Sequence, residues 1–382
     1  MRRIIASLVL AAGLSMAMPE AMAGYAQHQV VSGGAAHSLT VRPDGFVYTY
    51  GKNSHGQLGR GALGAYSSTP ASVPGISGAV SVAAGYGTSF VLTADGEVFA
   101  FGYGTQGQLG NGASADSNVP VQVSGLSNVI AISAGTDHAL ALGQSGKVYA
   151  WGSDNYGQLG NGACQGSSNV PVEVVGLTDI VGIAAGSYHS LAVRADGAVF
   201  AFGSNGYGNL GLGNWTNQQA PVQIPGLSGI REVAAGNNHS LFRKFDGTVY
   251  GAGANFSGQL GDGTTTTRIS PIQVPGISDA VSLATGSYHS MVLRANGSAL
   301  AFGSNSNGQL CIGSTTSATV PTAVVSADLQ ARGQGSSAGA ATSQLVDARG
   351  VLRGCGNNWS GQLGNGSMNA GPTTPTAAIA VW

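Results

Sequence analysis

Residues 183–211 read IAAGSYHSLAVRADGAVFAFGSNGYGNLG, and the motif that ends this stretch returns seven times, most often as GQLG. The copies are about 51 residues apart, and a fixed period of this kind marks a repeat architecture. Their leucines are Leu58, Leu109, Leu159, Leu210, Leu260, Leu310 and Leu363. Residues that recur in register with the motif are expected to form the scaffold, whereas residues that differ between copies are free to carry function.

Each copy contains the signals of a β-hairpin. Residues 189–193 and 198–202 alternate small or polar with apolar side chains, which is the period of a strand. Asp196 and Gly197 lie between them, and this pair favours a hairpin because glycine accepts the positive φ of a tight turn. A third strand is expected after a recurring proline, Pro221 in this copy, and a fourth is expected to lead into the next hairpin.

Four short antiparallel strands per unit, with no helical stretch between them, predict an all-β chain folded as a seven-bladed β-propeller. The chain stops partway through a unit at residues 375–382, and residues 27–34 resemble the part that would come next. We therefore expect the N- and C-terminal strands to close the ring within one blade. The expected organisation is a secretory signal peptide at 1–23 and a single propeller domain at 24–382.

The N-terminus has the features of a cleavable signal. Arg2 and Arg3 precede an apolar run, and the run is followed by Ala21-Met22-Ala23. Cleavage near Ala23 predicts a secreted or periplasmic protein, without deciding between the two, and no later apolar run suggests membrane insertion. Charged residues make up only 8% of the chain and form no basic stripe, which argues against a nucleic-acid partner. We expect a monomer.

Three cysteines allow at most one internal disulfide. The three are Cys164, Cys311 and Cys355; Cys311 replaces the last glycine of the sixth GQLG motif, and Cys355 stands where other copies have Phe or Trp. Cys311 and Cys355 lie in neighbouring repeats and could pair. The alternative is that both are small buried thiols.

The order of AAGxxHSL, the Asp-Gly hairpin, the VFAFG strand and GQLG resembles the repeats of the regulator of chromosome condensation family, over the whole chain after residue 23. The resemblance implies a seven-bladed propeller. The founding member is a nucleotide exchange factor for a small nuclear GTPase and binds chromatin, but an exported chain without a basic tail would meet neither partner. This chain looks like a secreted bacterial-type member. The secreted, propeller-type β-lactamase inhibitory protein is similar in using such a ring to bind a protein.

The sequence contains no pattern typical of catalysis or of a metal or cofactor site. Five of the seven histidines occupy one repeat position, where we expect each to hydrogen-bond the backbone of its own blade; these are His37, His138, His189, His239 and His289. A catalytic histidine would not recur in this way. We therefore expect a non-enzymatic protein with no catalytic residue, metal ion or cofactor.

Variable positions in two sets of loops hold aromatic residues. Because the central hairpin is antiparallel, the loop entering it and the loop leaving it lie at the same end, opposite the Asp-Gly turns. The predicted partner-binding residues there are Tyr86, Tyr103, Tyr156, Tyr188, Tyr207, Phe256, Tyr288 and Trp359, with Asp137, Asn237, Asn238, Asp154 and His55 as polar neighbours.

Aromatic side chains of this kind are enriched where proteins bind one another. The sequence therefore predicts an exported scaffold that binds a protein partner, whose identity it leaves open. One alternative is a glycan-binding, lectin-like propeller, because aromatic faces also stack on sugars. A weaker one is an enzyme that uses the central funnel.

Overall fold

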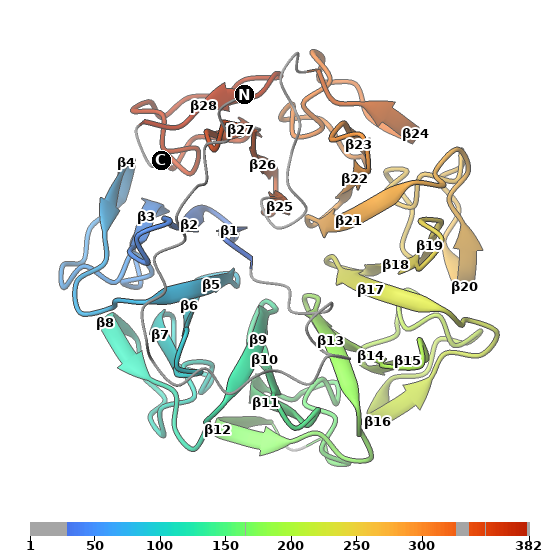
Figure 1. The fold of residues 1–382 in the computed structure, drawn as a ribbon, viewed down its shortest axis with the longest axis horizontal. Helices are drawn as coiled ribbons and strands as arrows, with labels where there is room; N and C mark the ends of the chain where they lie inside the picture. Colours follow the sequence, from blue (N-terminus) through green and yellow to red (C-terminus); the bar gives the residue numbers. More distant parts are fainter. Residues whose placement is uncertain (1–28, 165, 326–335, 348, 380–382) are drawn as a thin grey trace, which may run out of the picture.

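The structure is a computed structural model that describes residues 29–164, 166–325, 336–347 and 349–379. The predicted signal peptide at 1–23 lies outside these ranges. The described residues form seven four-stranded sheets and no helix. The sheets stand around a central axis as the blades of a closed ring (Figure 1), which confirms the predicted seven-bladed β-propeller.

Each blade is built from four consecutive strands. Blade 1 holds β1 (Val31–Gly33), β2 (His37–Val41), β3 (Val47–Lys52) and β4 (Tyr66–Ser72); blade 2 holds β5 (Ala79–Ala84), β6 (Thr88–Thr93), β7 (Val98–Gly102) and β8 (Ser117–Gln122). Blade 3 holds β9 (Val129–Ala134), β10 (His138–Gly143), β11 (Val148–Ser153) and β12 (Ser167–Glu173); blade 4 holds β13 (Ile180–Ala185), β14 (His189–Arg194), β15 (Val199–Gly203) and β16 (Gln218–Gln223). Blade 5 holds β17 (Ile230–Ala235), β18 (His239–Lys244), β19 (Val249–Gly253) and β20 (Arg268–Gln273); blade 6 holds β21 (Ala280–Thr285), β22 (His289–Arg294), β23 (Ala299–Gly303) and β24 (Ala318–Ala323). Blade 7 holds β25 (Ser336–Ala338), β26 (Thr342–Val346), β27 (Leu352–Gly356) and β28 (Thr376–Ala377).

The recurring proline lies inside the outermost strand in blades 1 to 6, and not before a strand as predicted. Pro221, for example, falls within β16, whose pairing with β15 shifts register between Ala201 and Gly203. An edge strand tolerates proline because one side of it needs no backbone donor. Only Pro375 precedes its strand, β28.

The predicted closure of the ring is wrong. β1 pairs with β2 and forms the innermost strand of blade 1, while β25 supplies the innermost strand of blade 7. The strand that precedes each hairpin therefore belongs to the same blade as that hairpin, and among the described residues no blade combines strands from the two ends of the chain. The ring closes by contacts between blades: Gly366 donates its backbone N–H to the Ser68 carbonyl at 2.9 Å, as Gly162 does to Gln219 at 3.0 Å.

The core is divided among the junctions between blades. Each of the seven clusters of buried apolar side chains joins two neighbouring blades. The leucine of every GQLG motif is buried in or beside them. Gly160, which ends the third motif, has φ of +61°, and a Cβ atom there would lie 2.7 Å from the Phe202 ring of the next blade. Glycine is therefore required for both its conformation and its small size.

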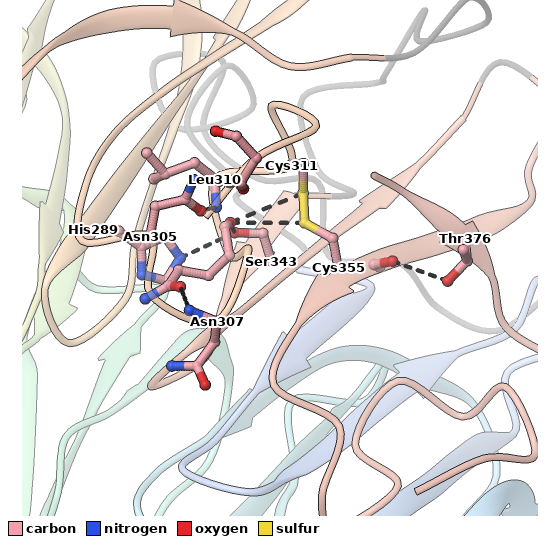
Figure 2. Close-up of a disulfide and its surroundings, with 11 residues drawn as sticks. His289, Asn305, Asn307, Leu310, Cys311, Ser343, Cys355 and Thr376 are labelled. Atoms are coloured by element: carbon pink, nitrogen blue, oxygen red, sulfur yellow. Dashed lines mark hydrogen bonds between the residues drawn. A yellow bond between two sulfur atoms is a disulfide. The ribbon is translucent and has the colours of Figure 1, made fainter. Parts of the chain in front are cut away.

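A disulfide joins Cys311 to Cys355, between blades 6 and 7 (Figure 2), with 5.7 Å between the two Cα atoms. Cys311 has φ of +59°, as the glycines of the other motifs do, and Cys355 pairs with Ser343 as Phe202 pairs with Ser190. The two cysteines thus replace the glycine and aromatic ring that meet at other junctions. Cys164 is exposed and free.

Candidate binding face

The loops that enter and leave the central hairpin of each blade lie at one end of the ring. In blade 4 the turn at 194–198 closes the hairpin at one end, with Arg194 N–H donating to the Ala198 carbonyl at 2.8 Å. The loops at 186–188 and 204–217 are at the opposite end of the same strands. We call the equivalent loops of all blades, together, the rim face.

The GQLG loops of the rim face are held by buried amides. In blade 4 the Asn205 side chain accepts a hydrogen bond from the Leu210 N–H at 3.0 Å, and its own Nδ2 donates to the Asn214 carbonyl. In blade 3 the Gln158 side chain accepts from the Tyr156 N–H at 2.9 Å. Equivalent bonds recur around the ring, so the residue presented at the tip of each loop stands on ordered backbone.

The structure places the eight predicted aromatic residues on the rim face, and four of them form two pairs that bridge neighbouring blades. Tyr156 and Tyr188 have ring centroids 5.5 Å apart, and Tyr207 and Phe256 are 6.0 Å apart in an edge-to-face contact. The exposed fractions are Tyr86 62%, Tyr156 41%, Tyr207 42%, Phe256 65%, Tyr288 47% and Trp359 63%. Tyr103 and Tyr188 are half-buried, Tyr103 against His55. Large apolar surface therefore remains open to solvent.

Two of the predicted polar neighbours make contacts on this face. The Asn237 Nδ2 donates to the Tyr288 hydroxyl at 3.0 Å. The His55 Nδ1 lies 2.9 Å from the Asp116 carboxylate. Sequence reasoning missed Asp116, because it falls in the stretch after GQLG where the repeat has no fixed residue.

Asp154 does not offer the polar contact beside the aromatic residues that the sequence predicted. It is buried, and its Oδ1 accepts from the Leu159 N–H at 3.0 Å, which is the structural role of asparagine in other blades.

The recurring histidines join blades and do not bind the backbone of their own blade as expected. His189 Nε2 lies 3.0 Å from the Ser240 hydroxyl of blade 5, and that hydroxyl donates to the Asn209 carbonyl of blade 4 at 2.6 Å. Since the hydroxyl proton is used on the carbonyl, the histidine must donate from Nε2. Burial lowers the pKa of His189 to about 3, so this ring is neutral.

In blade 2, where the recurring histidine is missing, the serine that it would contact on the next blade is replaced as well. Thr88 replaces the histidine, and Ala139 replaces the serine of blade 3. The Gln108 carbonyl that this serine would have bound instead accepts from the Trp151 indole N–H at 2.9 Å. At the last junction the Gln344 amide of blade 7 donates to the Ser38 hydroxyl. The recurring histidines and serines, and the side chains that replace them, therefore stabilise the junctions between neighbouring blades.

At the axis, the rim face opens onto a shallow funnel lined mainly by glycine and alanine backbone from all seven blades, with Tyr86, Thr136 and Asn237 among its side chains. Within the described ranges, no three histidine, cysteine, aspartate or glutamate side chains gather as metal ligands. The described part of the chain also has no helix that could span a membrane. The side chains of this face are aromatic rings and amides, together with the carboxylates of Asp116 and Asp137.

Comparisons with known proteins agree with this architecture. Human WBSCR16 superposes with a TM-score of 0.78 at 22% identity, covering 88% of this chain and 95% of that one. Prp20p of Saccharomyces cerevisiae superposes with a TM-score of 0.79 at 21% identity, covering 95% and 90%. At these identities the likeness concerns the fold.

Sequence relatives match shorter stretches. The regulator of chromosome condensation of Xenopus laevis is 39% identical over 85 residues, which is 22% of this chain and 20% of the relative. The probable E3 ubiquitin-protein ligase HERC3 of Homo sapiens is 32% identical over 211 residues, 53% of this chain and 20% of the relative. Each alignment thus spans one fifth of the relative's own length. The family model described as RCC1-like domain matches residues 13–336, and the chain therefore belongs to the RCC1-like domain family.

Proposed function

We propose that this chain is an exported, non-enzymatic scaffold that binds a protein partner through the aromatic residues of the rim face. The observation that carries the proposal is the exposure of large rings on ordered loops, at positions that the repeat leaves free. Phe256 and Trp359 are each more than 60% exposed although they lie within tightly bonded loops. Rings held in place before binding lose little conformational freedom when a partner covers them.

The composition of these loops also favours a protein partner. They are rich in glycine, asparagine and serine and hold six tyrosines, residue types that are enriched in antibody paratopes. A protein with a similar fold is known in complex with another protein: one solved structure is of Kap60 bound to yeast RCC1 (Prp20). Export is supported by the Cys311–Cys355 disulfide, since such bonds persist in oxidising compartments.

The test is capture of partners by purified protein lacking residues 1–23, from the extracellular and periplasmic fractions of the source organism. The double variant Tyr188→Ala, Trp359→Ala should lose a partner that the wild type captures. Phe46→Ala is the matched control, because Phe46 is 46% exposed but lies at an Asp-Gly turn on the opposite end of the ring. Equal capture by the double variant would remove the rim face from the mechanism. A glycan array tests the lectin alternative. If that alternative holds, the wild type should bind a sugar on the array and the same double variant should lose that binding.

A further inference from the structure

One part of the rim face, spanning blades 2 to 4, combines aromatic rings with a carboxylate. Tyr156 of blade 3 and Tyr188 of blade 4 meet at 5.5 Å with planes tilted by 59°. Asp137 is in the loop that enters the hairpin of blade 3, and its carbonyl accepts from the Ser153 N–H at 2.7 Å, which fixes its backbone. Tyr86 projects from the matching loop of blade 2 and is 62% exposed. We call these four residues (Tyr86, Asp137, Tyr156 and Tyr188) the blade 2–4 cluster.

The Asp137 carboxylate is partly buried, and within the described ranges it has neither a hydrogen-bond donor nor a cation beside it. Burial raises the pKa of this carboxyl group, as expected for an acid that lacks a compensating partner. Burial and the negative charge of Asp137 together raise the pKa of the nearby Tyr188 hydroxyl. The site therefore has a negative potential that the described residues leave unbalanced.

Among the residues that the structure describes, no basic side chain is placed to balance it. The rim loops of blades 2, 3 and 4 contain no lysine or arginine. Several arginines instead pair with acids near the Asp-Gly turns at the other end, as Arg194 does with Asp196 at 2.7 Å and Arg294 with Asp279 at 2.9 Å. Because no described side chain supplies a cation here, this role is left to a binding partner.

Tyrosine faces attract cations through the ring quadrupole, and a neighbouring carboxylate strengthens that attraction. We propose that the blade 2–4 cluster receives a cationic side chain of the protein partner, an arginine or lysine that packs on Tyr156 and Tyr188 and pairs with Asp137. The inference rests on the proposed function in taking the occupant to be a protein. It adds to that function the selection of a cationic side chain by this part of the rim face.

The test uses a small probe and needs no identified partner. N-acetyl-arginine-N-methylamide is titrated into protein with isotope-labelled tyrosine rings, and the ring signals of Tyr156 and Tyr188 are assigned with Tyr156→Phe and Tyr188→Phe. We expect both signals to shift with millimolar affinity and the affinity to fall at high salt. The citrulline analogue, which has the same shape without the charge, should produce no saturable shift.

Asp137→Asn should weaken binding of the arginine probe about three- to fivefold, as expected for loss of one partly exposed charge pair. Asp196→Asn, at the opposite end of the ring, should leave the affinity unchanged. Equal binding of citrulline, or an unchanged affinity in Asp137→Asn, would overturn the inference. If the probe fails to bind while Tyr188→Ala, Trp359→Ala still loses a captured partner, the proposed function stands without the cation site. If the probe binds while that variant keeps its partners, the cation site stands alone.

Discussion

Breaking the Cys311–Cys355 disulfide tests whether the two cysteines have taken over the role of a glycine and an aromatic ring. The bond closes a loop across a sequence separation of 44 residues. By chain entropy, a loop of that length stabilises the folded state by about 4 kcal/mol at 25 °C. Cys355→Ser should therefore lower the free energy of unfolding by about that amount under non-reducing conditions. Dithiothreitol should have the corresponding effect on the wild type.

The chain itself offers the rescuing variant. Gly160 and Phe202 occupy the equivalent positions at the junction of blades 3 and 4. In Cys311→Gly, Cys355→Phe, the glycine should relieve about 1 kcal/mol at the positive φ of residue 311. A buried phenylalanine should add about 1.5–3 kcal/mol. The double variant should thus recover most of the loss and be insensitive to reductant.

Urea denaturation, followed by tryptophan fluorescence with and without dithiothreitol, measures all three proteins. The expected order of midpoints under reducing conditions places the double variant above both the reduced wild type and Cys355→Ser. If the double variant is no more stable than Cys355→Ser, the pocket at this junction does not accept an aromatic ring. The reasoning from repeat equivalence would then be refuted.

The buried histidines predict acid sensitivity: their pKa values are lowered to about 3 or 4 by burial, so only the unfolded chain takes up protons between that range and pH 6.5. The free energy of unfolding should therefore fall as pH drops below 6.5, by up to about 1.4 kcal/mol per pH unit for each histidine. Urea midpoints at pH 7.5, 6.5 and 5.5 measure this dependence. An uptake of less than one proton on unfolding between pH 6.5 and 5.5 would contradict the prediction. Ser240→Ala should cost about 1–3 kcal/mol by leaving two buried groups unpaired. Ala139→Ser should gain nothing in the same denaturation assay, because no histidine faces it. Gly186→Ala should cost about 1–3 kcal/mol, since its Cβ would lie 2.3 Å from the His189 ring, whereas Gly206→Ala has nothing within 4 Å and should leave the thermal midpoint unchanged.

Hairpins were predictable because their signals are local. The pattern around Asp196 and Gly197 predicted strands at 189–193 and 198–202, and the structure has β14 at His189–Arg194 and β15 at Val199–Gly203. The placement of β1 was not predictable in the same way. From its sequence, a strand that precedes a hairpin could pair with that hairpin or complete the previous blade, and only its backbone hydrogen bonds decide which blade it joins.

The candidate site also has features that the sequence predicts and features that only the packing of loops decides. The aromatic positions could be found from the repeat, because they vary where their neighbours do not. The burial of Asp154 and the contact between His55 and Asp116 could not, since both depend on how loops of one or two blades pack.

The sequence alone determined the number of blades, the hairpins, the turn glycines and the two cysteines that depart from the repeat, because each is written within one unit of about 51 residues. Tertiary structure decided which strands of the repeat form one blade, how the ring closes and which residues the histidines contact. Those contacts join equivalent positions of neighbouring units, as between His189 and Ser240, and a pair so far apart in the chain is fixed only when the blades pack.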